Sequence, residues 1–129
     1  MHAPTSTVDQ LIEAINHGDL DAAVALYEED GVLVVQPGKI ARGSEELRHA
    51  LEGFIAMKAN LRSEAQQVIE YGDLALYLSR WSLRGTDPAG KAVTMGGQST
   101  DILRRQRDGR WLIAVDNPWG AQLLPRVES

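Results

Sequence analysis

Cysteine is absent from the 129-residue sequence, and its absence excludes several kinds of site at once. Without thiols there is no disulfide framework, no cysteine nucleophile and no thiolate metal site. The histidines His2, His17 and His49 are predicted in a terminal segment, at a helix end and on a helix surface, which is not a metal-ligand cluster. Gly96 and Gly97 follow no strand-to-helix transition, so a glycine-rich phosphate loop is not indicated. We therefore expect neither a metal nor a cofactor.

The sequence also lacks a long apolar run and an excess of basic residues. No apolar stretch approaches the ~18 residues that a membrane-spanning helix needs. The first ten residues do not show a basic region followed by an apolar one, as a signal peptide would. We therefore expect a cytoplasmic protein with no membrane partner. The net charge of −5 argues against a nucleic-acid partner, because phosphates are neutralised by a basic face.

What the sequence does contain is enough apolar material for a buried core. Hydrophobic residues make up 43% of the chain and charged residues 24%, which is typical of a globular protein and not of a disordered one. No linker, internal repeat or low-complexity segment divides the chain. We therefore predict one domain over residues 1–129.

The first half of the chain has the apolar periodicity of helices. A first helix is predicted to open at Ser6 or Thr7, since each begins a capping-box pattern, and to end at Gly18. Apolar residues recur with helical spacing from Val8 to Ile15. This helix should therefore turn one apolar face toward a core.

Two more helices and two short strands follow the first helix. Asp19 is in position to cap a second helix, which is predicted to end at Asp30-Gly31. Val32–Val35 is a β-branched apolar run that predicts a buried strand, and Lys39–Arg42 predicts a small return strand. A third helix is expected directly after the return strand.

The second half of the chain has the pattern of an antiparallel meander. Turn-forming sequences separate four runs that predict strands, at Arg62–Tyr71, Leu74–Gly85, Ala92–Arg105 and Arg110–Asn117. Gly96-Gly97 predicts a bulge or a sharp bend that would curl the sheet. The predicted fold class is α+β, a cone-shaped barrel with three N-terminal helices packed on a curled, mainly antiparallel sheet and a conical cavity between them.

Two acids stand where the last strands would bury an apolar side chain, Asp101 in the third run and Asp116 in the fourth. An unpaired buried carboxylate is costly, so each acid lies at an edge, is hydrogen-bonded or serves a function. The two acids are nearly equally distant from the hairpin turn at Asp108, so their side chains could approach each other. Asp116 also precedes Asn117 and Pro118, and a structural role in ending the strand is equally open for it.

Strand alternation leaves two registers open. In the register that we favour, Asp101 faces the pocket together with Ser99, and Asp116 faces it from the last strand. The other residues of the last strand then divide into a pocket side, Leu112 and Ala114, and an outward apolar row, Trp111, Ile113 and Val115. Such a row favours a dimer, because it would not stay exposed to water. The opposite register places both acids outside.

Four stretches carry a resemblance to a known family: ALYEEDGVLV, ARGSEEL, LALYLSRWSLRGTDPAGK and GGQSTDILRRQRDGRWLIAVDNPWG. They resemble the nuclear-transport-factor-two-like superfamily, and more narrowly its SnoaL-like and ketosteroid-isomerase-like bacterial branch. The resemblance covers about Val8 to Gly120. It implies a cone-shaped α+β fold, a homodimer through the sheet and a pocket at the wide end. It does not imply one chemistry, because the superfamily includes isomerases, cyclases, epoxide hydrolases, transport adaptors and assembly domains.

The match to ketosteroid isomerases fails at two of their three catalytic positions. In place of their general base, after the second helix, this sequence has Val35 and Gln36. The oxyanion-hole tyrosine of their first helix also has no counterpart here. The remaining position, an acid kept protonated in an apolar site, falls on Asp101. Steroid isomerisation is therefore not predicted.

The match to limonene epoxide hydrolases, which use an acid, an arginine and a second acid, is also partial. Asp101 and Asp116 fall near the two acid positions. Ser99 stands where that family has its arginine, and Arg80 on the neighbouring strand is the candidate replacement. Hydrolysis therefore remains one of several reactions that the resemblance leaves open.

The predicted function is the binding of a small, mostly hydrophobic organic molecule in a conical pocket. Cofactor-free acid/base chemistry of the isomerase, cyclase or hydrolase type is its catalytic extension, with Asp101 and Asp116 as the catalytic candidates. The candidates for ligand contact are Ser99, Trp81, Arg80, Asn117 and Trp119. The competing prediction is a non-catalytic ligand-binding or dimeric interaction module in which both acids are structural.

Overall fold

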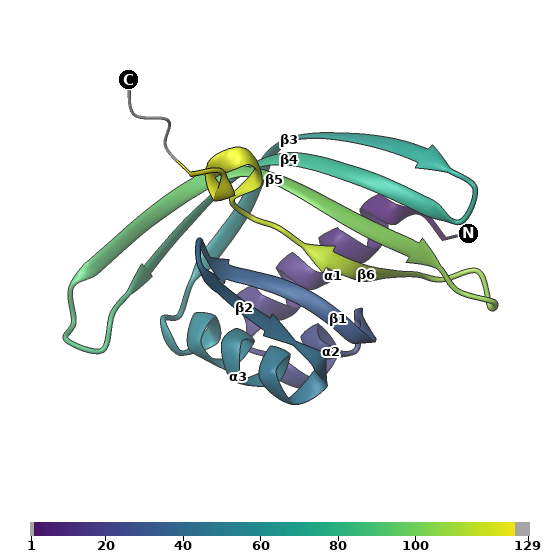
Figure 1. Cartoon of the computed structure of the whole chain (residues 1–129). Coiled ribbons are helices and arrows are strands. Elements are labelled where there is room, and N and C mark those ends of the chain that lie inside the picture. The colour runs from purple at the N-terminus through teal and green to yellow at the C-terminus, as the bar shows by residue number, and fades with distance from the viewer. Residues whose placement is uncertain (1, 126–129) are drawn as a thin grey trace, which may run out of the picture.

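Three helices and a curled six-stranded sheet make up the computed structural model, which describes residues 2–125 (Figure 1). The helices are α1 (Pro4–His17), α2 (Leu20–Val24) and α3 (Gly43–Ala56), with a short 3-10 helix, η1 (Gly120–Leu123), near the C-terminal end. The strands are β1 (Tyr27–Gln36), β2 (Lys39–Arg42), β3 (Asn60–Tyr71), β4 (Leu74–Thr86), β5 (Ala92–Arg105) and β6 (Trp111–Asp116). The bounds of β2 to β6 lie within two residues of those predicted from the sequence.

Pairing between distant segments arranges the strands in the order β2-β1-β6-β5-β4-β3. Neighbouring strands are antiparallel except β1 and β6, which run parallel. The outer strands β2 and β3 do not pair with each other, so the sheet curls without closing (Figure 1). The helices pack on its concave side. The predicted α+β class, with helices on a curled and mainly antiparallel sheet, is confirmed.

Helix α1 begins earlier than its sequence pattern predicted. Pro4 opens the helix, where its missing N–H costs nothing, and the N-cap residue Ala3 makes no side-chain cap. Thr7 does not cap the helix, because its hydroxyl donates to the Trp111 carbonyl oxygen at 2.6 Å. The predicted C-terminal stop is confirmed, since Gly18 has the left-handed φ of +75°. The capping-box prediction was therefore wrong, and that threonine ties α1 to β6 instead.

Helix α2 is much shorter than predicted. Asp19 caps it as expected, by accepting the Ala22 N–H at 3.1 Å, but the helix ends at Val24. Tyr27 already belongs to β1, which continues through the short strand predicted after the helix. The cause is pairing with β6: Tyr27 lies opposite Ile113 in the parallel ladder. Pairing across the chain overrides a local helical pattern here.

For the double glycine of β5 the sequence predicted a bulge or a sharp bend, and the strand register excludes the bulge. The β4–β5 register runs unbroken past the two glycines, with Gly97 opposite Trp81 and Gly96 opposite Ser82. The glycines are explained by close approach instead, because a Cβ on Gly96 would lie 2.8 Å from the Trp81 carbonyl oxygen. The register shifts lie elsewhere, in the β3–β4, β5–β6, β1–β2 and β1–β6 pairings.

The hydrophobic core lies between the helices and the concave face of the sheet. Its largest fully buried side chains are Tyr77, Leu47, Leu51, Leu103 and Ile113. The predicted apolar face of α1 packs against them. In the described part of the chain, no helix has the length and apolarity needed to cross a membrane. The core leaves one part of the concave face unfilled, and this is where the candidate site lies.

Candidate functional site

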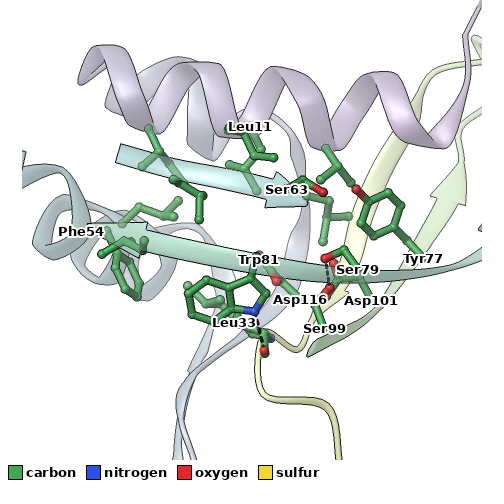
Figure 2. A pocket seen from close by; sticks show the side chains of 18 of the residues that line it. Leu11, Leu33, Phe54, Ser63, Tyr77, Ser79, Trp81, Ser99, Asp101 and Asp116 are labelled. Carbon is green, nitrogen blue, oxygen red and sulfur yellow. Dashed lines mark hydrogen bonds between the residues drawn. The ribbon is translucent and has the colours of Figure 1, made fainter. Parts of the chain in front are cut away.

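A partly enclosed cavity of about 100 Å³ lies between α1, α3 and the concave face of the sheet (Figure 2). Most of its wall is apolar or aromatic. The polar side chains in the wall are Tyr27, Ser63, Tyr77, Ser79, Ser99, Asp101 and Asp116. Figure 2 shows the acids and serines gathered at one end, with Phe54 at the other. An apolar cavity with a few convergent polar groups is the usual form of a small-molecule site.

Asp101 lies within β5 and lines the cavity, with only 6% of its surface exposed. Its Oδ1 accepts the Asn117 backbone N–H at 2.8 Å, and Ser99 also hydrogen-bonds to the carboxyl group. Burial, followed by the negative charge of Asp116, raises the pKa of Asp101 well above its usual value, although these hydrogen bonds oppose the rise. We therefore expect Asp101 to be the proton-carrying acid of the pair.

Asp116 ends β6 beside Asp101 and keeps part of its surface exposed. Burial raises the pKa of Asp116 too, but hydrogen bonds from Tyr27 and Asp101 lower it. Tyr27 donates its phenol O–H to Oδ2 at 2.5 Å, and burial raises the pKa of Tyr27, which keeps the phenol protonated. Because the pKa of Asp101 is raised more strongly than that of Asp116, a proton held by the pair is expected on Asp101 and the negative charge on Asp116.

A bulge in β6 brings Asp116 to the cavity. Leu103 of β5 pairs with Ile113, whereas the residue before it pairs with Val115. Ala114 is therefore an extra residue on β6, and side-chain alternation changes phase around it. Because of this change, Ile113 and Asp116 both line the cavity although they are three positions apart. The predicted register, which had no bulge, was right for Val115 and Asp116 and wrong for the apolar residues before the bulge.

The predicted outward row of Trp111, Ile113 and Val115 is wrong for its first two members, whereas Val115 pairs with the exposed Ile102 and faces outward as predicted. Trp111 and Ile113 are only 3% and 2% exposed, so they belong to the core. Apolar residues do cover the outer face of the sheet, but most come from β4 and β5. Leu74, Leu76 and Ile102 are 38%, 38% and 39% exposed, and Ile69 and Tyr71 of β3, which pair with Leu76 and Leu74, are 52% and 84% exposed. The sequence argument for a dimer therefore relied in part on residues that are buried.

The predicted contacts Ser99, Trp81 and Trp119 all line the cavity. Ser99 shares a hydrogen bond with Ser79 across β4 and β5, with 2.5 Å between the hydroxyl oxygens. Trp81 donates its indole N–H to the Pro118 carbonyl oxygen at 2.7 Å (Figure 2). Trp119 donates to the Val35 carbonyl oxygen at 3.1 Å. The two indole rings meet edge to face with centroids 5.6 Å apart. The segment after β6 is thereby fixed as one wall of the cavity.

Two predicted contacts lie elsewhere. Arg80 is exposed and does not line the cavity, because alternation along β4 turns Trp81 inward and Arg80 outward. Asn117 does not line it either. Its side-chain amide donates to the Thr100 hydroxyl at 3.0 Å and to the Gly120 carbonyl oxygen at 3.2 Å. The prediction that Arg80 supplies a positive charge to the pocket was wrong, and Asn117 builds the turn that holds Asp101.

Several residues of the site were not predicted from the sequence. Tyr27 was assigned to a helix, and no local pattern shows that it contacts an acid 89 positions away. Tyr77 and Ser79 were detectable, because they share the parity of Trp81 and must face the same way once that tryptophan is placed inward. Tyr77 donates to the Gln66 side-chain oxygen at 2.8 Å. The missing information was the facing of β4, since both of its faces are apolar.

The charge of the wall limits the ligands that it suits. Within the described residues, the cavity lining includes no Lys, Arg or His. No three His, Cys, Asp or Glu side chains gather as metal ligands would among residues 2–125. What the wall does offer is two acids with raised pKa values, more strongly raised for Asp101 than for Asp116, and the hydroxyl groups beside them. Such an arrangement can donate a proton, accept one and bind a polar group of an otherwise apolar molecule.

Several solved structures share this fold. A nuclear transport factor 2 (NTF2-like) superfamily protein from Salmonella enterica serovar Typhimurium has 15% identity and a TM-score of 0.78, over 88% of this chain and 84% of that one. A ketosteroid isomerase-like protein from Erwinia carotovora atroseptica has 26% identity and a TM-score of 0.71, over 87% and 88%. SalBIII, an epoxide hydrolase/cyclase-like enzyme of pyran ring formation in salinomycin, has 17% identity and a TM-score of 0.70, over 87% and 85%.

These likenesses show the fold and do not select one chemistry. None of the curated proteins matches this sequence. A model of the SnoaL-like domain does match it, over residues 8–113, which run from α1 into β6 and include Asp101. The match covers well over half of the chain. The chain therefore belongs to the SnoaL-like domain family.

Proposed function

We propose that the cavity binds a small, mostly hydrophobic organic molecule and that Asp101 and Asp116 act on it by acid/base chemistry without a cofactor. The observation that carries this proposal is a buried carboxylic acid, Asp101, in contact with a second acid inside an apolar cavity. A buried acid with a raised pKa beside a carboxylate is the usual arrangement of a general acid and a general base. We further propose that the chain acts as one domain in the cytoplasm.

The proposed roles follow from where the proton lies. Asp101 donates its proton to an oxygen of the bound molecule, such as a carbonyl or an epoxide oxygen. Asp116 accepts a proton from a carbon, a hydroxyl group or a water molecule, and the pair ends with the proton count with which it began. Tyr27 keeps Asp116 oriented and ionised by its hydrogen bond. An isomerisation, a cyclisation or a hydrolysis would each satisfy this balance.

The second candidate function is ligand binding without chemistry. It is favoured by the structural bonds of the acids, since Asp101 accepts the Asn117 backbone N–H and Asp116 accepts the Tyr27 phenol. An acid that only completes such bonds needs no catalytic role. The two functions differ in what an isosteric amide would do, because an amide keeps the acceptor oxygen and loses the transferable proton.

The first prediction concerns turnover in the Asp101→Asn variant. In a screen of small ketones, lactones and epoxides, we expect any substrate of the wild type to be turned over at least about 100-fold more slowly, because the general acid is lost. Asn retains an oxygen for the Asn117 N–H, so the fold should be kept. Product formation is measured by mass spectrometry, and thermal unfolding checks the fold.

The matched control for this prediction is Arg80→Ala, since Arg80 is on the same sheet but faces outward. Its turnover should equal that of the wild type. If Asp101→Asn retains wild-type turnover while folded, Asp101 is not the acid. If the cavity binds compounds but no compound is turned over by the wild type, the binding module is the better description.

We also propose a homodimer through the outer face of the sheet, where Leu74, Leu76 and Ile102 leave an apolar surface. Leu76→Lys should place a charge in that interface and convert the dimer to a monomer. Sedimentation velocity measures the change in mass. Ile40→Lys is the control, because Ile40 is also an exposed apolar residue, at 57%, but belongs to β2. A monomeric wild type, or a Leu76→Lys variant that stays dimeric, would contradict the proposal.

A further inference from the structure

The polar hydrogens of the aromatic side chains in the cavity wall are already used within the protein. Trp81 and Trp119 donate their indole N–H groups to backbone carbonyl oxygens. Tyr27 donates to Asp116, and Tyr77 donates to a glutamine oxygen. These four bonds turn the largest donors of the wall away from a ligand. A ligand that needs to accept hydrogen bonds from aromatic donors therefore finds none free here.

The serine hydroxyl groups are partly committed as well. Ser79 and Ser99 bond to each other, with 2.5 Å between their oxygens and either one as the donor, so one of their two protons is used. Asp101 accepts the Asn117 backbone N–H with its Oδ1.

Much of the unused acceptor capacity of the wall lies on Asp116. A carboxylate offers about four lone-pair positions, and the Tyr27 phenol occupies one of them. Asp116 is partly exposed and lines the cavity, where most of its neighbours are apolar. No cationic side chain lines the cavity within the described residues, so the negative charge of the acid pair has no counter-charge from the wall. A hydrogen-bond donor with a positive charge would satisfy both needs.

The rest of the wall suits an organic cation as well. Trp81, Trp119, Phe54 and the two tyrosines bring aromatic rings to the cavity, and aromatic faces attract cations. The cavity is only partly enclosed and has a volume of about 100 Å³, so the ligand body is small. An anion, by contrast, would meet the negative charge of the acid pair and, within the described residues, no cationic side chain in the lining.

We propose that the molecule bound in this cavity is a small apolar amine, whose ammonium group hydrogen-bonds to Asp116 while its hydrocarbon part lies against the aromatic wall. This assignment rests on the proposed function, because it takes the cavity to be the binding site, and it adds the ligand class. Asp101 keeps its proton in this complex, since one ammonium group balances the single negative charge of the pair. Acid chemistry at a neighbouring oxygen of the amine therefore remains available.

The test uses three probes of one shape, isopentylammonium, isopentyl alcohol and isovalerate, titrated into the protein at pH 7 and followed by calorimetry. We expect the ammonium ion to bind at least about tenfold more tightly than the alcohol, because hydrogen bonds to ionised groups are roughly twice as strong as neutral ones. Isovalerate should show no binding.

Variants test whether the preference for ammonium comes from the acid pair or from the net negative charge of the protein. Asp101→Asn should keep the preference for ammonium, because Asp116 retains the charge. The Asp101→Asn, Asp116→Asn double variant should bind ammonium and alcohol within about twofold of each other, since no charge remains to pair with the ammonium group. Asp30→Asn removes one exposed charge of β1 and should leave the preference unchanged.

Two results would overturn the amine assignment and leave the proposed function standing. One is equal or tighter binding of the alcohol, and the other is a preference for ammonium that survives in the double variant. If no probe binds but the substrate screen finds turnover that depends on Asp101, the ligand class is wrong and the catalytic proposal survives. If no probe binds and no compound is turned over, the amine assignment and the proposed function both fail.

Discussion

The double variant Asp101→Asn, Asp116→Asn is expected to gain stability over the wild type as the pH rises, by up to about 1.4 kcal/mol per pH unit above about pH 4. The reason is the proton that the acid pair keeps in the folded state. The pKa of Asp101 is raised well above its usual value, first by burial and then by the charge of Asp116. In the unfolded chain both acids return to ordinary values near about 3.9.

The sign of the effect follows from proton binding. Above about pH 4 the unfolded chain releases protons from these acids, whereas the folded protein retains one. The stability contributed by the pair is therefore fully present below about pH 4, and it falls as the pH rises through the raised folded-state pKa. The double variant has amides in place of both acids and holds no such proton. Its free energy of unfolding should therefore not fall in this way as the pH rises.

Urea unfolding of both proteins at half-unit steps from pH 4 to pH 8 measures the difference. Asp30→Asn is the control, because Asp30 is exposed and its removal should shift stability by a nearly constant amount. A difference between the double variant and the wild type that stays flat over this range would contradict the shared proton. It would also remove the main physical support for Asp101 as a general acid.

Gly120→Ala is expected to lower the free energy of unfolding by about 3 kcal/mol or more. Gly120 has a φ of +53°, which side chains other than that of glycine adopt with strain. A Cβ at this position would also lie 2.5 Å from the Gln98 carbonyl oxygen, a backbone atom of β5 that cannot move aside. The substitution would push η1 away from the sheet and shift Trp119, which forms part of the cavity wall.

Gly38→Ala is the matched control, because Gly38 also has a positive φ, +88°, but a Cβ there would meet no atom within 4 Å. It should cost only the backbone strain, about 1 kcal/mol. Urea unfolding gives both values, and tryptophan fluorescence reports on the wall. If both variants lose the same free energy of unfolding, η1 can move away from β5 at little cost. The close contact between Gly120 and β5 would then not be what holds the cavity wall in place.

Local patterns predicted the meander well and β1 poorly, and the difference has a physical cause. Strands β3 to β6 are bounded by turn residues, which mark their ends in the sequence itself. The first residues of β1 are a strand because they pair with β6, and nothing near Tyr27 encodes that partner. The same limit hid the contact between Tyr27 and Asp116.

The acids show how far alternation can be followed. It correctly indicated that Asp101 lies in the cavity with Ser99, because β5 is regular along that stretch. It failed on β6, where Ala114 is an extra residue that no glycine or other turn residue announces. The side to which Arg80 points could not be predicted for a different reason. Both faces of β4 carry apolar residues, so the sequence alone does not show which face is buried.

The parallel pairing of β1 with β6 also governs the order in which a growing chain can build the site. Strand β1 lies between β2 and β6 in the sheet, yet β6 begins 75 residues after β1 ends, at Trp111 against Gln36. At synthesis rates of about 5–20 residues per second, β1 waits roughly 4–15 s for its second partner. Both acids of the pair, Asp101 and Asp116, also follow β1 by more than 60 residues. The cavity therefore gains its acid pair only after β6 has been synthesised.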